Sequence, residues 1–255
     1  SRSVQRPDAA GLIAAGNTAV SDLAQIWGSP EVNDDITIFG NFGLDLGNDN
    51  EAYMFGNFSE RDVRGGFYFR NPHTRGGIYS NGDTDGDGVS NLLIGDLDGL
   101  GVGESCLPVN ITSDNVLTQE DYINNVANND NCFAFNELFP GGFTPRFGGE
   151  IKDASLFWGL KGETANHWMF DISASLGYSR IDYFIHTTIN PSLGPDSPTA
   201  FSPGSAAQLE KNINFDVSRE FEVGLSVPLN FAAGVEWRRE TFSQVAGDPA
   251  SYQVG

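Results

Sequence analysis

The chain has 255 residues, of which 34 are Asp or Glu and 14 are Lys or Arg, giving a formal net charge of −20. A surface this acidic repels the phosphates of nucleic acids, so we exclude DNA and RNA as partners. No apolar run is long enough for a membrane-spanning helix, so we also exclude a helical membrane protein. The 31 Gly and 19 Phe residues instead favour an all-β protein with Gly-rich turns and rings of aromatic side chains.

The first 33 residues carry little periodic pattern. We expect an irregular lead-in over residues 1–33, with a short helical tendency at residues 18–26. No signal peptide is recognisable, because residues 9–20 lack both a basic leader and a strong apolar core. We therefore expect the chain to be an internal piece of a longer protein.

Two strands are expected next. Apolar side chains recur at alternate positions over residues 34–46, which is the pattern of a strand with one apolar face. Residues 47–50 have the sequence Gly-Asn-Asp-Asn, which is the composition of a tight turn. A long strand follows over residues 51–70, and the glycine pair at residues 65–66 predicts a bend or bulge within it.

The middle of the chain contains two long connections. Residues 71–149 are poor in periodicity, and loops of this length are uncommon unless they are functional or disordered. Strands are expected over residues 150–162 and 168–188, with a short turn between them. Residues 190–205 are rich in Pro, Ser and Gly and predict a second loop.

The last two expected strands, residues 207–219 and 229–245, alternate strictly between apolar and polar side chains. We expect one side of these strands to face lipid and the other to face a wet lumen. The predicted lipid-facing residues are Ile213, Phe215, Val217, Leu229, Phe231 and Val235. The predicted lumen-facing residues are Asn212, Asn214, Asp216, Asn230 and Glu236. The same alternation fits half-buried strands of a soluble sandwich, so this pattern alone does not decide between the two.

The lengths of the connections favour the membrane barrel. Short turns at one end of the strands and long loops at the other are typical of outer-membrane barrels, whereas a sandwich has no reason to separate them. We therefore predict that residues 34–255 form part of an antiparallel transmembrane β-barrel, with residues 71–149 and 190–205 as extracellular loops. Six strands are too few to close a large-pore barrel, which again predicts a piece of a longer protein.

Four segments carry a family resemblance. They are residues 60–77 (ERDVRGGFYFRNPHTRGG), 135–150 (FNELFPGGFTPRFGGE), 184–204 (FIHTTINPSLGPDSPTAFSPG) and 235–242 (VEWRRETF). Together they resemble the barrel hairpins of TonB-dependent outer-membrane receptors, and the resemblance covers most of residues 34–255. The chain departs from the family pattern because it has no recognisable plug, no TonB box and no closing C-terminal strands.

The resemblance implies a fold, a location and a set of partners. The family's fold is a 22-stranded barrel filled by a plug, in the outer membrane of a Gram-negative bacterium. Its members import scarce nutrients such as ferric siderophores, cobalamin or glycans. The implied partners are the TonB complex, reached through a plug absent from this chain, the outer-membrane lipid with its lipopolysaccharide, and a small-molecule or glycan ligand.

An acidic segment of the long loop predicts a calcium site. Aspartates alternate with other residues and end in a glycine, in the order Asp83, Asp85, Asp87 and Gly88. Alternate carboxylates of this kind converge on a hard cation, and Gly makes the turn. Ile94 stands where an EF-hand has its bidentate Glu, so the segment is not an EF-hand, and Asp96 or Asp98 is needed to complete a site. The alternative is a solvated acidic loop that binds no ion.

The two cysteines both lie in the long loop. Cys106 and Cys132 form an even count in a protein expected outside the cytosol, which predicts a disulfide between them. A zinc site is not expected, because the three histidines, His73, His167 and His186, are scattered and match no zinc spacing.

Aromatic side chains of the long loop are candidates for ligand contact. Phe135, Phe139 and Phe143 are expected to be exposed on the loop, where apolar side chains mark contact with a partner. The alternative is that they pack the loop into a small core of its own. Arg146 is a candidate for an anionic group of the ligand, and the alternative is pairing with carboxylates such as Glu150.

Catalysis is not expected. The chain has no G-x-S-x-G nucleophile elbow, so we predict a protein that binds and transports rather than an enzyme. The alternative function is that of a secreted or cell-surface β-protein, stabilised by calcium, acting as an adhesin or an assembly component. A requirement for detergent distinguishes the barrel from this alternative.

Overall fold

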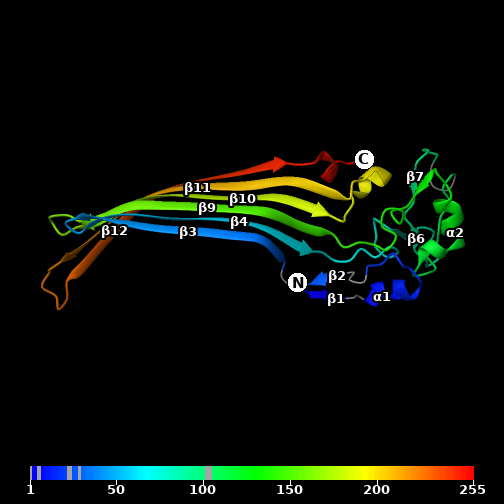
Figure 1. Ribbon diagram of the computed structural model, residues 1–255, viewed down its shortest axis with the longest axis horizontal. Coiled ribbons are helices and arrows are strands. Elements are labelled where there is room, and N and C mark those ends of the chain that lie inside the picture. The colour runs from blue at the N-terminus through cyan, green and yellow to red at the C-terminus, as the bar shows by residue number, and fades with distance from the viewer. Residues whose placement is uncertain (1, 5–6, 22–24, 28–29, 101–104) are drawn as a thin grey trace.

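The computed structural model describes residues 2–4, 7–21, 25–27, 30–100 and 105–255. Its long body is a six-stranded sheet in the order β12-β11-β10-β9-β4-β3, and every neighbouring pair is antiparallel (Figure 1). The strands are β3 (Glu31–Gly47), β4 (Asn50–Gly66), β9 (Arg146–Glu163), β10 (Met169–His186), β11 (Ala200–Phe221) and β12 (Leu229–Ala246). The predicted antiparallel β fold is therefore confirmed. Within the described residues the sheet is open, because β3 and β12 are its two edges and do not pair with each other.

Short elements gather at one end of this sheet, at the right of Figure 1. They include β1 (Arg2–Val4), α1 (Pro7–Ala14), β2 (Gln25–Trp27), β5 (Ser80–Gly82), β6 (Asn91–Leu92), β7 (Gly95–Asp96), η1 (Val116–Thr118), α2 (Glu120–Tyr122), η2 (Ile123–Ala127), β8 (Cys132–Phe133), η3 (Pro191–Asp196) and η4 (Pro249–Ser251). In the described part of the chain, no helix has the length and apolar character needed to cross a membrane.

Alternation of side chains gives the sheet two different faces. One register row runs across all six strands through Phe42, Met54, Trp158, Ala174, Ile213 and Trp237. The next row, which points to the opposite face, runs through Asn41, Phe55, Phe157, Ser175, Asn212 and Arg238. The two sets of residues predicted on β11 and β12 lie on these two opposite faces, as expected.

The apolar face of the sheet has no covering layer among the described residues. Phe42 at one edge is 64% exposed, and Trp237 at the other edge is 52% exposed. The buried hydrophobic clusters all lie at the end of the sheet or beyond it, in residues 9–20, 69–143 and 189. Among the described residues the sheet therefore has no buried hydrophobic cluster of its own, and its strands are joined by continuous hydrogen-bond ladders.

Short turns join the strands at the other end. In the first turn, Asn48 and Asp49 have φ angles of 53° and 60°, which is the left-handed pair that a two-residue hairpin needs. The following turns connect β9 to β10 and β11 to β12. By the register, the strand residues next to the three turns, Asn50, Glu163 and Phe221, lie level with Ala233, Ala232 and Leu229 of β12. Each hairpin thus extends further along the sheet than the one before it.

Several predicted boundaries are wrong. β4 ends at Gly66, at the glycine pair where a bend was expected, so the strand does not continue to residue 70. β11 begins at Ala200, inside the predicted loop of residues 190–205, and the second loop spans only residues 187–199. The loop composition of this segment is overridden by pairing, because Ser205 and Gly204 form register pairs with both β10 and β12.

The N-terminal segment is more ordered than predicted. α1 covers Pro7–Ala14, and β1 pairs with β2, so the described part of residues 1–33 is not an irregular lead-in. The helix predicted at residues 18–26 is wrong: residues 25–27 form a strand, and residues 22–24 lie outside the described residues. Pro at the first helical position and Asp8 in the first turn favour a helix that begins at Pro7.

Candidate functional site

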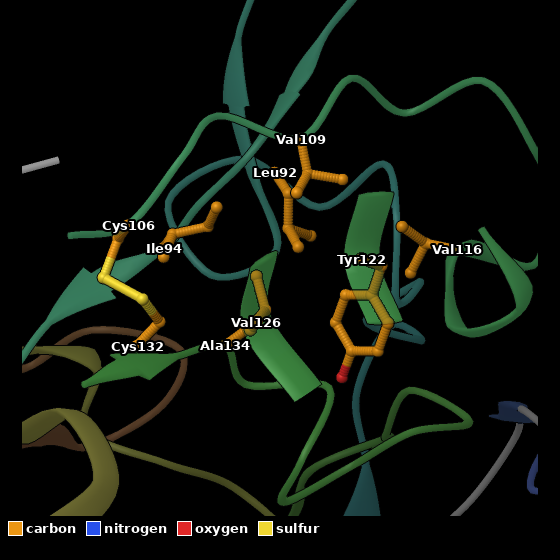
Figure 2. Packing of buried hydrophobic residues seen from close by; sticks show 9 residues of the cluster. All are labelled: Leu92, Ile94, Cys106, Val109, Val116, Tyr122, Val126, Cys132 and Ala134. Atoms are coloured by element: carbon orange, nitrogen blue, oxygen red, sulfur yellow. A yellow bond between two sulfur atoms is a disulfide. The ribbon is translucent and has the colours of Figure 1, made fainter. Parts of the chain in front are cut away.

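The candidate site is the structure formed by residues 67–145, between β4 and β9, which we call the loop body. Its main core contains Leu92, Ile94, Cys106, Val109, Val116, Tyr122, Val126, Cys132 and Ala134 (Figure 2). The aromatic ring of Tyr122 is part of this core, and burial raises the pKa of its hydroxyl to about 12. The long loop is thus a folded unit around a core, which its lack of periodicity did not predict.

The predicted disulfide is present in this core. Cys106 and Cys132 are bonded, with their Cα atoms 5.6 Å apart and 26 residues of sequence separation (Figure 2). Cys132 belongs to β8, which pairs with β7 so that Asp96 lies opposite Cys132. The bond therefore joins the segment that follows β7 to the segment that leads back toward the sheet.

The phenylalanines predicted to contact ligand lie mainly in a second cluster of the loop body. This cluster contains Tyr79, Phe133, Phe135, Phe143 and Ile189, with Phe139 partly buried against it. Phe135 is 5% exposed and Phe143 is 4% exposed, so the expectation that these two rings are exposed is wrong. Their rings fill the core of the loop, which was the alternative, and contact of Phe135, Phe139 and Phe143 with a ligand stays a prediction.

A hydrogen bond and a residue from the second loop complete this cluster. The buried Tyr79 hydroxyl donates to the carbonyl oxygen of Phe139 at 3.0 Å, and burial strongly raises the pKa of this hydroxyl. Ile189 comes from residues 187–199, so the two long connections of the chain share one core. The two loops predicted to lie on the same side of the sheet are therefore in contact.

Arg146 lies at the junction of the loop body and the sheet. It is the first residue of β9 and is paired in register with Gly66 and His186. Among the described residues, no carboxylate forms an ion pair with its guanidinium, so the predicted alternative of pairing with Glu150 is not formed. Its half-exposed side chain remains a candidate for an anionic group.

The N-terminal segment packs onto the loop body. Ala9, Leu12 and Val20 form a buried cluster with Phe69. The side-chain amide of Asn17 donates to the carbonyl oxygen of Pro140 at 2.9 Å. These contacts place α1 in the same assembly of loops, a role that the sequence did not suggest because they join residues more than 50 positions apart.

The acidic segment forms a tight exposed turn. One carboxylate oxygen from each of Asp83, Asp85 and Asp87 lies within 4.8 Å of the others. Asp83 accepts hydrogen bonds from the backbone N–H groups of Gly86 and Gly88, at 2.7 and 3.0 Å. Carboxylate oxygens at this spacing match the ligands that Ca²⁺ prefers, and backbone carbonyls and waters supply the further oxygens that calcium sites use.

Asp96 does not join this group. It lies on β7, opposite Cys132, and its carboxylate accepts hydrogen bonds from the Asp98 backbone N–H and the Ser105 hydroxyl. The three clustered carboxylates of Asp83, Asp85 and Asp87 are the only such group in the described residues. The structure therefore brings together three of the four predicted metal ligands.

His73 is a partly buried titratable residue that the sequence did not single out as one with a shifted pKa. Its Nε2 lies 3.5 Å from a carboxylate oxygen of Asp114, and its Nδ1 is buried without a hydrogen-bond partner. Burial lowers the pKa of His73, while the nearby carboxylates of Asp114 and Asp8 oppose this shift. Asp8 of α1 and Asp114 of the loop body both act on this ring although they are distant from it in sequence, and no sequence spacing could have revealed this.

The polar face of the sheet carries a network of side-chain contacts. The Tyr53 hydroxyl donates to Asp171 at 2.8 Å, and Arg238 pairs with Glu210 at 2.9 Å. The rings of Phe55 and Phe157 stack with centroids 4.9 Å apart on this same face. Such a face suits contact with water or with polar protein groups, and it contrasts with the bare apolar face behind it.

Comparison with known protein families, with curated proteins and with solved structures gives no match to this chain.

Proposed function

We propose that this chain forms part of the wall and the outer cap of a TonB-dependent β-barrel transporter in the outer membrane of a Gram-negative bacterium. The observation that carries the proposal is the uncovered apolar face, which continues across all six strands. Soluble proteins rarely expose a contiguous apolar patch larger than a few hundred Å². Lipid chains are the covering that such a face fits best.

The height of the apolar band agrees with this proposal. On β12 the band runs from Leu229 to Trp237 and ends at Arg239. From the first to the last of the three turns, the end of the hairpin shifts by four residues along the strand direction, over four steps from strand to strand. At ordinary strand spacings this shift corresponds to a strand tilt of about 35°. At that tilt, the ten residue-to-residue steps from Leu229 to Arg239 rise by about 27 Å, close to the ~25 Å apolar band of outer-membrane barrels.

The direction of the stagger also supports a curved wall. On β4, β9 and β10 the apolar band ends at Glu60, Lys152 and Arg180, which lie level with Ser243 of β12. On β12 the apolar band ends at Arg239, four residues closer to the short turns. The band therefore runs diagonally to the register, as it does when tilted strands surround a barrel axis.

The loop body supports the role of a cap. It lies at the end opposite the short turns, together with α1 and the second loop (Figure 1). The family resemblance assigns this end to the outside of the cell, where ligand arrives. The imported ligand belongs to the family's range of ferric siderophores, cobalamin or glycans, and energy coupling runs through a plug and the TonB complex.

A loop deletion tests this proposal. Removing residues 95–131 together with a Cys132→Ser change is expected to reduce uptake while the barrel still assembles in the outer membrane. Uptake is measured with a panel of ferric siderophores, cobalamin and oligosaccharides, and assembly is measured by resistance to heat in detergent. The matched control is Cys106→Ser with Cys132→Ser, which removes the disulfide and keeps the loop. Unchanged uptake of every ligand in the panel contradicts the proposal.

The acidic turn favours a second candidate function, a calcium-stabilised β-protein at the cell surface that acts as an adhesin. The supporting observation is the convergence of Asp83, Asp85 and Asp87. Under this candidate the chain stays soluble without detergent and needs Ca²⁺ to fold, whereas the transporter wall needs detergent or lipid. A comparison of the chain in both conditions, with and without a chelator, separates the two functions.

A further inference from the structure

One cation lies on the apolar face close to the short turns. Arg219 of β11 has its guanidinium carbon 5.7 Å from the ring centroid of Trp168 and 5.0 Å from that of Phe221. Trp168 in turn meets Phe221 and Phe231 edge to face, with centroids 6.0 and 6.1 Å apart. Two aromatic rings, Trp168 and Phe221, therefore contact the guanidinium, and Phe231 packs against Trp168.

This arginine lacks an anionic partner within the described chain. Its Nε is buried and has no hydrogen-bond partner, and no carboxylate pairs with it among the described residues. The nearest acidic residue in sequence, Glu220, points to the opposite face because the strand alternates. In a chain with a net charge of −20, this position on an apolar face is where an anion from outside would bind.

The position of Arg219 along β11 indicates how deep in a bilayer such an anion would lie. Arg219 and Lys211 are on the same face of β11, and only Ile213, Phe215 and Val217 lie between them on that face. Lys211 is level with Arg239, at one limit of the apolar band, and Arg219 is level with Phe231, one row inside the other limit at Leu229. Both cations therefore lie near the margins of the band, where the polar headgroups of a bilayer would meet its hydrocarbon. Aromatic side chains also concentrate at these margins in outer-membrane barrels.

We infer that Arg219, with Trp168, Phe221 and Phe231, binds the phosphate group of a phospholipid headgroup in the leaflet that faces the short turns. This inference rests on the proposed membrane location. The planar guanidinium can donate two parallel hydrogen bonds to phosphate oxygens, and the aromatic rings provide an apolar seat for the adjoining glycerol and acyl carbons. A single bound lipid phosphate then compensates the charge of the guanidinium.

The opposite margin offers a natural control. Lys211 and Arg239 are paired across β11 and β12, and both side chains are exposed on the same apolar face. Neither cation has a described aromatic clamp like that of Arg219. Changing Arg239→Gln removes the same charge at the other side of the bilayer, and it leaves the Arg219 site intact.

Native mass spectrometry of the protein purified from outer membranes in mild detergent tests the inference. The wild type is expected to retain a phospholipid, and Arg219→Gln is expected to reduce the retained fraction about tenfold, as lost charged hydrogen bonds imply. Arg219→Lys keeps the charge without the planar fork and is expected to retain an intermediate fraction. Arg239→Gln is expected to retain as much phospholipid as the wild type. Heat modifiability in detergent verifies that each variant is folded.

Three results overturn the inference. One is equal phospholipid retention by the wild type and Arg219→Gln. Another is an equal loss with Arg239→Gln, which indicates unspecific charge attraction. The third is displacement of the retained lipid by millimolar inorganic phosphate, which indicates a site for free phosphate. If the protein is not found in the membrane at all, the proposed function fails together with the inference, whereas insertion with equal retention overturns the inference alone.

Discussion

The six-stranded sheet and the loop body at its end are stabilised in different ways. The loop body has buried clusters and a disulfide, as expected of a small domain in water. The sheet has long hydrogen-bond ladders and large apolar side chains that stay exposed. This difference supports the proposed location, because the loop body excludes water by its own packing, whereas the apolar face of the sheet is left for lipid to cover.

Loss of the disulfide should lower stability more than any other change considered, and the loss of stability should be confined to the loop body. Replacing Cys106 and Cys132 by Ser removes a cross-link over 26 residues, which is worth about 3.5 kcal/mol in the chain-entropy model. The measurement is the thermal unfolding of the loop body, with hydrogen exchange of its backbone amides as the readout. Equal protection in the double variant and the wild type would show that the hydrophobic clusters alone hold this region.

A charge on the apolar face should destabilise the sheet by a similar or slightly smaller amount. Phe215→Arg places a cation midway between Lys211 and Arg219, and at the middle of a bilayer this costs about 2–4 kcal/mol. The matched control is Asn214→Arg, on the polar face opposite Glu236, where we expect little change. The measurement is the midpoint of urea unfolding in lipid vesicles. Equal tolerance of the two changes would contradict the assignment of faces.

Calcium should have a smaller effect, limited to the loop body. If Asp83, Asp85 and Asp87 bind Ca²⁺ with a dissociation constant of about 1 mM, then about 10 mM calcium stabilises this region by about 1.4 kcal/mol. Asp85→Asn is expected to weaken binding, and Asp96→Asn is its control because Asp96 lies outside the group. Calorimetric titration measures the binding, and no heat at millimolar calcium would contradict the site.

The smallest effect expected concerns His73. Its pKa is lowered from the ordinary value of 6.5, so the unfolded chain binds this proton more readily than the folded one. The contribution of neutral His73 to the free energy of unfolding is therefore complete above about pH 6.5, and it is lost as the pH falls toward the pKa of His73 in the folded protein. His73→Gln should flatten the stability of the loop body between about pH 7 and pH 5, measured by thermal unfolding. An unchanged slope would exclude His73 as its source.

The sequence predicted the sheet well and the loop body poorly, for a physical reason. Alternation at residues 213–217 reports directly which face each side chain takes, because strand geometry repeats every two residues. Cys106 and Cys132 could be paired because they were the only candidates. The burial of Phe135 and the position of α1 could not be predicted, because both depend on contacts between distant segments that follow no period.

The open edges of the sheet have a consequence for handling the protein. β3 and β12 each present a row of backbone donors and acceptors that no described strand satisfies. Such edges are templates for pairing with another copy, and the exposed apolar face would strengthen that association. Expressed by itself in water, the chain should therefore form β-rich aggregates or fibres by edge-to-edge growth. Recovery from inclusion bodies by refolding directly into detergent is then the practical route to a homogeneous sample.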